Sequence, residues 1–236
     1  MNLFSGHPTL LVIMPHPDDE TSACGGTIAR AKAAGAAVHV MIMSAGDLRH
    51  YHNGQSEVTG QTRAEELGAA MRCLGVDSHT VVYLDTERHL RLDALPRREL
   101  MAQIERENEL SIDRLRPDIV ILPAPSYNQD HVATFEAGFA ACRPHLPCEK
   151  AFVPIVLSAD CSQLAWSVAP LRQCVYVDIS GPHLERKLQA HACHQSQLRP
   201  EPHHASLAGV ERLARLRGSE VAVEAAEAFA CHRMML

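Results

Sequence analysis

Short apolar runs that alternate with stretches of helical character are the feature that most restricts the fold of this chain. The run at residues 10–14 is followed by an Ala-rich stretch at 21–34, which ends at Gly35. A glycine in this place commonly closes a helix in the left-handed conformation, and the next apolar run occupies residues 38–43. A strand, a helix and a second strand at this spacing predict parallel pairing through a right-handed crossover.

The alternation continues along the chain, with further strands expected at 80–84 and 119–122 and helices at 62–74, 96–115 and 132–142. The last third is less regular, with strands expected at 152–157 and 174–179 and amphipathic helices near Leu184, Val210 and Val223. This pattern predicts an α/β fold of three layers, with a Rossmann-like, doubly wound and mostly parallel sheet. No linker or repeat interrupts the 236 residues, so a single domain over 1–236 is expected in preference to two small ones.

An imidazole and three carboxylates directly follow the first apolar run, in the sequence Pro15-His16-Pro17-Asp18-Asp19-Glu20. In open α/β folds, ligands bind in the crevice beyond the carboxyl ends of the strands. A histidine beside a carboxylate at that place is a common arrangement for holding a divalent metal. The plainer alternative is that these residues only begin a helix, where Asp and Glu are favoured in any case.

A second polar cluster, Asn128-Gln129-Asp130-His131, has the same context, because it follows the apolar run at 119–122 and precedes a helical stretch. In a parallel sheet both clusters open onto the same edge. His16, Asp19 and His131 are therefore candidate metal ligands. Two histidines and one carboxylate with an open fourth position are typical of catalytic zinc sites. Asp18, beside a ligand, is left to act as a base.

These motifs resemble the PIG-L or LmbE-like family of zinc-dependent N-deacetylases, which remove acetyl groups from N-acetylglucosamine-type substrates. The resemblance covers nearly the whole chain. The opening His-Pro-Asp-Asp-Glu motif is its specific part, and the supporting segments are Thr62-Arg63-Ala64-Glu65-Glu66-Leu67, Arg116-Pro117-Asp118, Asp130-His131, Lys187 with His194-Gln195-Ser196-Gln197, and residues 218–229.

The resemblance implies an amidohydrolase that uses zinc, or another divalent metal such as Fe2+, with Asp18 as its general base. It implies that Arg63 holds a substrate oxygen through its planar fork of donors. The residues alone, without the resemblance, favour a solvated ion pair between Arg63 and Glu66, three positions apart on a helix. Glu20 is expected as a second substrate contact.

One cluster departs from the family pattern. Family members often carry His-x-Asp-His where this chain has Asn128-Gln129-Asp130-His131, and in the family the first histidine is thought to help stabilise the transition state. Asn128 offers a neutral amide in that catalytic role, and His194 is a candidate imidazole recruited from elsewhere. Asp130 is either the partner of the His131 ring or a cap for the helix that follows.

Composition narrows the partners and the location. The net charge is −6 with histidine neutral, and the basic residues are scattered, which gives no electrostatic footprint for nucleic acid or an anionic membrane. No charged-then-apolar leader opens the sequence, and its apolar runs fall far short of the roughly 18 to 20 residues that span a bilayer. A soluble, cytoplasmic enzyme of a small-molecule N-acetyl sugar conjugate is expected, with homo-oligomerisation left open.

Other classes of protein compete with this reading. A dinucleotide-binding Rossmann protein needs Gly-x-Gly-x-x-Gly after the first strand, where this chain has the His-Pro-Asp-Asp-Glu turn. A glycosyltransferase could use Asp18 and Asp19 on a metal-bound nucleotide sugar, but it gives His16 and His131 no task. A catalytically altered sugar-binding relative, or a hydrolase of a different amide-linked small molecule, stays open because of Asn128.

Overall fold

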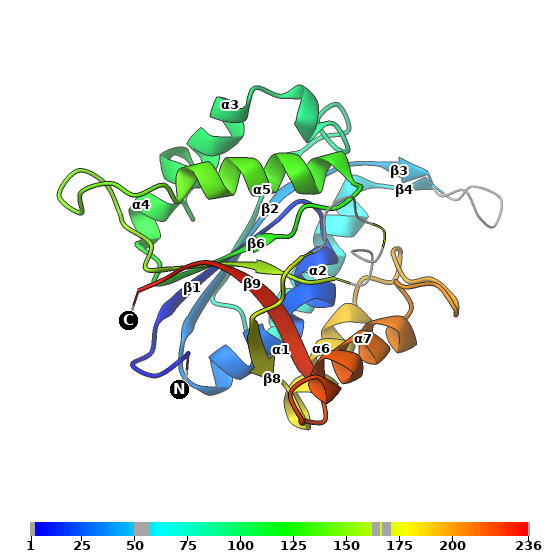
Figure 1. Ribbon diagram of the computed structural model, residues 1–236. Coiled ribbons are helices and arrows are strands. Elements are labelled where there is room, and N and C mark those ends of the chain that lie inside the picture. Colours follow the sequence, from blue (N-terminus) through cyan, green and yellow to red (C-terminus); the bar gives the residue numbers. More distant parts are fainter. Residues whose placement is uncertain (1–2, 50–56, 162–165, 167–170, 236) are drawn as a thin grey trace.

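A seven-stranded sheet lies between two layers of helices in the computed structural model, which describes residues 3–49, 57–161, 166 and 171–235 (Figure 1). Across the sheet the strands are β5 (Ser78–Leu84), β2 (Ala37–Ala45), β1 (Thr9–Met14), β6 (Ile119–Pro123), β7 (Ile155–Ala159), β9 (Ala226–Met234) and β8 (Val175–Asp178). The first five are parallel, and β9 runs antiparallel to both β7 and β8. The predicted doubly wound, mostly parallel sheet is confirmed.

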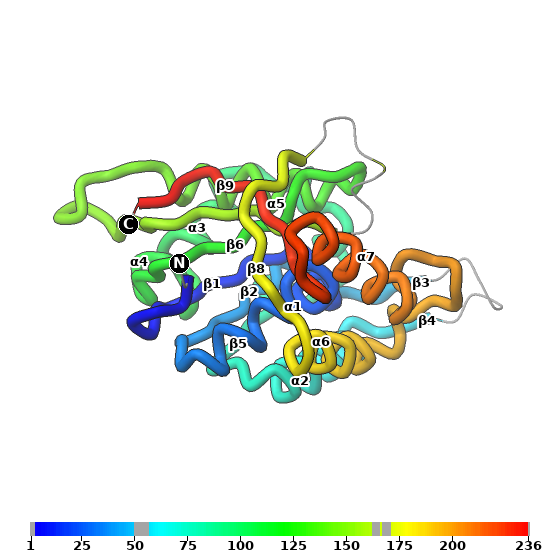
Figure 2. The backbone as a smooth tube through the Cα atoms, turned by 60° about the horizontal axis from the view of Figure 1, so that its bottom comes forward, coloured from blue at the N-terminus to red at the C-terminus, as the bar shows by residue number. Residues whose placement is uncertain are grey.

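The two faces of the sheet carry separate groups of helices, which the tube in Figure 2 shows as layers on either side. One face is covered by α1 (Asp19–Ala33), α2 (Gly60–Leu74), α6 (Pro182–His191) and α7 (Leu207–Ser219). The other face is covered by η1 (Leu92–Ala94), α3 (Arg97–Ala102), the π turn η2 (Gln103–Glu107), α4 (Ile112–Leu115) and α5 (Gln129–Ala141). A small antiparallel pair, β3 (Leu48–Arg49) and β4 (Glu57–Val58), stands apart from the sheet.

The central strand β1 is buried on both faces, which explains its continuous apolar sequence. Leu10, Val12 and Met14 belong to the core beneath α1 and α2, whereas Leu11 and Ile13 belong to the core beneath α5. This alternation is the two-residue period of a strand. From β1 the chain moves to β2 and β5 on one side and later returns to β6 on the other. The direction of winding therefore reverses between β1 and β6, where the crevice of a doubly wound sheet lies.

The helix expected at 96–115 is broken into three pieces. α3 passes into η2, and Asn108 then adopts extended backbone angles before α4 begins at Ile112. The side-chain oxygen of Asn108 accepts a hydrogen bond from the Leu110 N–H at 2.9 Å. Such local side-chain bonds compete with helical ones, which is the physical reason for the break.

The prediction of a helix near Val223 is wrong. The chain turns through Ala222, which has a φ of 59°, and continues as strand β9 between β7 and β8. The sequence from Glu224 to Ala228 favours a helix on propensity alone, yet Ala226, Ala228 and Phe229 are buried in the sheet. Pairing on both sides of β9 overrides local preference here.

No helix in the described segments is both long and apolar enough to cross a lipid bilayer.

Candidate metal centre and active site

The turn between β1 and α1 holds the first motif in a strained backbone. Asp18 has a φ of 107° and a ψ of −27°, a region that non-glycine residues rarely occupy and that costs about 1–3 kcal/mol. Neighbouring carboxylates stabilise the turn. The His16 N–H donates to Asp19 Oδ2 at 3.2 Å, and the Asp18 N–H donates to Glu20 Oε2 at 3.0 Å. The motif therefore supports its own backbone.

His16, Asp19 and His131 come together where β1 and β6 end. Asp19 Oδ2 lies 3.5 Å from His16 Nδ1 and 3.4 Å from His131 Nε2. One ligand atom from each residue lies within 4.8 Å of the others, and no other group of three or more His, Cys, Asp or Glu does so among the described residues. The structure thus places the three predicted ligands at a spacing that fits one metal ion.

Asp130 is the partner of His16 rather than of His131. Its Oδ2 lies 2.9 Å from His16 Nε2, and its Oδ1 accepts the Leu92 N–H at 2.9 Å. The predicted alternative, a helix cap by Asp130, is wrong, because Asn128 caps α5 by accepting the Asp130 N–H at 2.9 Å. Asp130 therefore fixes the ring of His16 with Nδ1 towards Asp19.

The adjacent carboxyls of Asp18 and Asp19 differ in proton affinity. Burial, and after it the charge of Asp19, raise the pKa of Asp18 to about 7, although His194 and Arg63 oppose the shift. Burial also acts to raise the pKa of Asp19, but the charges and hydrogen bonds of His131 and His16 outweigh it and hold that pKa below its usual range. Carboxyls separated in this way are suited to different tasks, one as an anionic ligand and the other in proton transfer.

His194 reaches this turn through Glu20. Glu20 Oε1 lies 2.7 Å from His194 Nε2, while its other oxygen holds the Asp18 N–H, and both side chains are fully buried. Burial acts to lower the pKa of His194, but the charge of Glu20 outweighs it and raises the pKa. This placement favours a supporting role for Glu20 over the predicted substrate contact. Direct contact of His194 with a reacting oxygen stays a prediction.

Arg63 is 3% exposed, so the solvated ion pair with Glu66 is not formed. Its Nη1 donates to His89 Nε2 at 2.5 Å, and its Nη2 donates to the Pro17 carbonyl at 3.4 Å. Glu66 instead accepts the backbone N–H and the hydroxyl of Ser196. Arg63 therefore lies against the turn that carries Asp18.

His89 is a site residue that the sequence reasoning missed. Its ring packs edge-on against His16, with ring centroids 5.1 Å apart. Burial, together with Arg63 and His16, lowers the pKa of His89 to about 3. The neutral ring accepts from Arg63, so its Nδ1–H donates to Ser44 Oγ at 3.2 Å. The signal available in the sequence was its place shortly after β5, at the same edge of the sheet as the two motifs.

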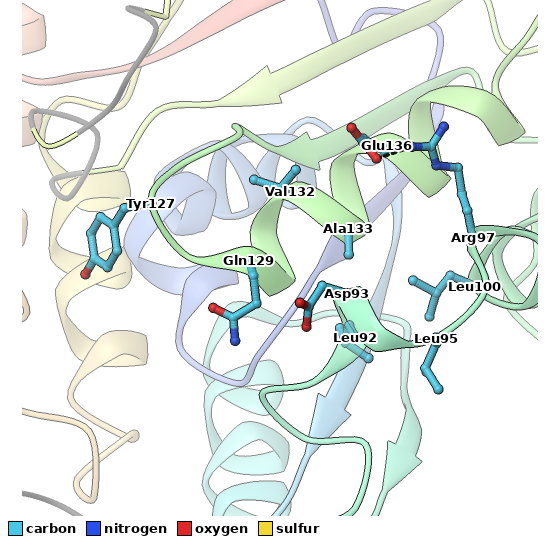
Figure 3. Close-up of a pocket in the computed structure, with 10 residues that line it drawn as sticks. All are labelled: Leu92, Asp93, Leu95, Arg97, Leu100, Tyr127, Gln129, Val132, Ala133 and Glu136. Carbon is cyan, nitrogen blue, oxygen red and sulfur yellow. Dashed lines mark hydrogen bonds and ion pairs between the residues drawn. The ribbon is translucent and has the colours of Figure 1, made fainter.

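A cavity of about 480 Å³ lies beside the site, against a different face of α5 (Figure 3). Gln129, Val132 and Ala133 line it from α5, and the facing wall comes from η1 and the start of α3. Leu92 connects the cavity to the triad of candidate ligands, His16, Asp19 and His131. Its side chain lines the cavity, while its N–H donates to Asp130, the hydrogen-bond partner of His16. None of the three candidate ligands lines this cavity.

Comparison with known sequences gives the family. The sequence model described as "PIG-L: GlcNAc-PI de-N-acetylase" matches residues 11–142, which include the triad, Asp18, Arg63 and Asn128. The chain belongs to the PIG-L family. Lys187 and His194 lie beyond the matched stretch.

This PIG-L chain is 28% identical over 139 residues to the uncharacterized deacetylase YaiS of Escherichia coli, covering 57% of this chain and 68% of that protein. It is 40% identical over 74 residues to a 1D-myo-inositol 2-acetamido-2-deoxy-alpha-D-glucopyranoside deacetylase of Rhodococcus opacus. That match covers 28% of this chain and 25% of the enzyme.

Solved structures share the fold along its length. The N,N'-diacetylchitobiose deacetylase of Pyrococcus horikoshii matches with a TM-score of 0.72 at 20% identity, covering 98% of this chain and 86% of that one. GalB, the 4-carboxy-2-hydroxymuconate hydratase of Pseudomonas putida, matches with a TM-score of 0.71 at 21% identity, covering 97% and 98%. Proteins named for different reactions therefore have this fold, and the chemistry has to be argued from the site.

Proposed function

We propose that this PIG-L protein is a zinc-dependent amidohydrolase that removes the acetyl group from an N-acetylglucosamine-type sugar conjugate. The observation that carries the proposal is the convergence of His16, Asp19 and His131 beside Asp18 at the reversal point of the sheet. Family membership and relatives named as deacetylases support it.

The donor set fits a divalent metal. His16, Asp19 and His131 supply two imidazole nitrogens and one carboxylate, the combination of many catalytic zinc sites, and Fe2+ is the alternative metal. When bound, the ion polarises the amide carbonyl and lowers the pKa of water. Asp130 supports this set by accepting a hydrogen bond from His16 Nε2–H. The other ring nitrogen of His16, Nδ1, then has the lone pair that a metal can bind.

Asp18 is the general base in this proposal. Its carboxylate removes a proton from water as the water oxygen bonds to the acetyl carbon, and the same carboxyl returns the proton to the nitrogen as the C–N bond breaks. The products are acetate and the free amino sugar. A pKa raised to about 7 suits a group that accepts and donates within one cycle near neutral pH.

Arg63, which is cationic, and Asn128, which is neutral, are the proposed hydrogen-bond donors around the reacting group. Arg63 is held against the Asp18 turn, where it could donate to a substrate oxygen. The cap of α5 uses the Asn128 oxygen, so its amide NH2 remains to donate where the family usually has an imidazole. His194 is proposed as a catalytic support, either directly or through Glu20.

The proposed substrate is a small-molecule N-acetyl sugar conjugate, and the proposed location of the enzyme is the cytoplasm. Homo-oligomerisation is left open.

A single experiment tests the activity. The metal-free protein is reloaded with Zn2+ or Fe2+ and assayed for acetate release on a panel of N-acetyl sugar conjugates, with Asp18→Asn as the inactive control. Release that requires metal supports the proposal. Metal and sugar binding without any release indicates the catalytically altered relative, and hydrolysis confined to other amides indicates a different substrate class.

A further inference from the structure

Helix α1 is interrupted five residues after the candidate ligand Asp19. Cys24, with a φ of −143° and a ψ of 20°, has non-helical backbone angles and divides α1 into two parts. In a continuous helix the Gly26 N–H would donate to the Ser22 carbonyl, four residues earlier. In α1 each group of this pair has another partner, and both partners are charged side chains from distant segments.

Lys187 of α6 and Glu227 of β9 supply these partners. Lys187 Nζ donates to the carbonyls of Ser22 at 2.7 Å and Thr21 at 3.0 Å. Glu227 accepts the N–H groups of Gly26 at 3.0 Å and Thr27 at 2.6 Å. Lys187 Nζ and Glu227 Oε1 also lie 2.5 Å apart. The ion pair therefore bonds backbone groups on both sides of the kink.

The surroundings are shaped to admit this pair. The side chains of Lys187 and Glu227 are 2% and 4% exposed. A Cβ atom on Gly25 would come within 3.3 Å of Lys187 Cγ, and one on Gly26 would come within 2.6 Å of Ile179. Two successive glycines inside a helix weaken it relative to alanine. At this place they allow α6 and the end of β8 to approach the kink closely.

The charges match the helix ends that they meet. The carboxylate of Glu227 binds the amino-terminal end of the second part, and the ammonium of Lys187 binds the carboxyl-terminal end of the first, which is the favourable sign at each end of a helix. The first part is too short to be stable alone. Its direction is therefore set jointly by the turn that follows β1, which the motif's own hydrogen bonds support, and by the contacts that hold the kink.

We propose that the buried Lys187–Glu227 pair is a positioning device for the catalytic turn, which keeps α1 kinked so that Asp19 meets His16 and His131. The hydrogen-bond partners of the pair among the described residues are the backbone of α1 and each other, not the candidate ligands. Its function is exerted through the backbone of residues 21–27. The kinetic part of the proposal rests on the proposed deacetylase function, whereas the metal-binding part can be measured without turnover.

The test replaces both charges with apolar side chains of similar volume, as Lys187→Met/Glu227→Leu. Such double replacements of buried ion pairs are often neutral for stability, so the variant is expected to fold. Without the pair, the Gly26 N–H can return to the Ser22 carbonyl and the helix can straighten. We expect the affinity for Zn2+, measured by competition with a chromophoric chelator, to fall about 10- to 100-fold, the effect typical of losing support behind a ligand. We expect kcat to fall with little change in KM.

A matched control is the Glu105–Lys150 pair, whose side chains are 5% and 8% exposed and whose Glu105 lies in η2, on the opposite face of the sheet. Lys150→Met/Glu105→Leu is expected to leave Zn2+ affinity and kcat unchanged. If the Lys187→Met/Glu227→Leu variant fails to fold, Glu227→Asp decides, because it keeps both charges and shortens the reach to Gly26 and Thr27 by one methylene. We then expect weaker Zn2+ binding at an unchanged melting temperature, with the native chain as reference.

The proposal is overturned if Lys187→Met/Glu227→Leu or Glu227→Asp folds and binds Zn2+ as tightly as the native chain, even when its melting temperature changes. That result would make the pair purely structural. Failure of the proposed function looks different, because the native protein itself would then bind no Zn2+ or release no acetate.

Discussion

Asp18 and Asp19 are neighbours in the sequence with opposite environments, and this contrast decides what each can do. Asp19 is held as an anion by two imidazoles, whereas burial keeps the Asp18 proton exchangeable near neutral pH. Asp18 has a strained, positive φ. Its side chain therefore does not take the direction relative to Asp19 that a regular helix would impose on two successive residues.

Removing a candidate ligand should remove the metal. His16→Ala and His131→Ala are each expected to lose bound Zn2+ and acetate release together, because each deletes one of three donors within 4.8 Å of one another. His191→Asn is the matched control, since His191 is also a buried histidine but binds Thr21 Oγ1 outside the triad. Metal analysis by mass spectrometry checks both. Full Zn2+ occupancy in His16→Ala or His131→Ala would contradict the ligand assignment.

Removing the base should spare the metal. Asp18→Asn is expected to retain Zn2+ and to lower kcat by about 10²- to 10⁴-fold, the usual contribution of a general acid or base. Asparagine tolerates positive φ better than most residues, so the turn should persist. Asp93→Asn, at an exposed carboxylate on the neighbouring cavity, serves as control. A kcat close to that of the native chain in Asp18→Asn would move the base to another residue.

The role of His194 is separable from that of Glu20. His194→Ala is expected to lower kcat by about 10²- to 10³-fold with Zn2+ still bound, if the imidazole supports the developing oxyanion. Glu20→Gln keeps a side chain of the same size but removes the charge that pairs with His194. Equal losses in the two variants would assign the effect to the pair, and unchanged kcat in His194→Ala would leave that ring a packing role alone.

At the scale of elements, Asn128 serves the start of α5 in a way that the family comparison did not foresee. Loss of an N-cap costs about 0.5–2 kcal/mol, so Asn128→Ala should lower the free energy of unfolding by roughly 1 kcal/mol. Asn128→Ser keeps a capping oxygen and removes the amide NH2. A native melting temperature with reduced kcat in Asn128→Ser would show that the amide acts on the substrate, whereas native values of both would confine Asn128 to capping.

Elements also show where sequence reasoning succeeds. The ends of β1 and β6 were predictable because a polar cluster directly follows a continuous apolar run in each case. The sequence alone therefore predicted that His16, Asp19 and His131 lie close together. His89 was missed, because its place after β5 was its one signal and nothing near it in the sequence indicates Arg63, 26 positions away, or the ring of His16. β9 was misjudged for a related reason: its alanines favour a helix, and only pairing with β7 and β8 makes it a strand.

The whole molecule should lose stability as the pH falls, and His191 is one cause. Burial, with help from the charges of His194 and Lys187, lowers the pKa of His191 to about 3, against 6.5 for an ordinary histidine. The unfolded chain therefore binds a proton below pH 6.5 that the folded chain does not. The stability contributed by His191 is complete above that pH and is lost as the pH falls towards 3.

Between pH 6.5 and 5 this amounts to at most about 2 kcal/mol, at 1.36 kcal/mol per pH unit. His191→Asn should flatten the dependence of the free energy of unfolding on pH in that window, measured by urea denaturation. His7→Asn, at an exposed histidine, should leave the slope unchanged. Equal slopes for His191→Asn and the native chain would remove His191 as a cause.

The insertion of β9 between β7 and β8 also orders events in time. β8 pairs only with β9 among the described strands, and Glu227 of β9 binds the backbone of α1. During synthesis the segment with Asp19 emerges first, but the residue that holds its kink follows about 200 residues later, roughly 10–40 s at ordinary rates of translation. A nascent chain that has not yet gained β9 therefore has the candidate ligands without the frame that sets them, and metal capture is expected to wait until the last strand of the sheet has been made.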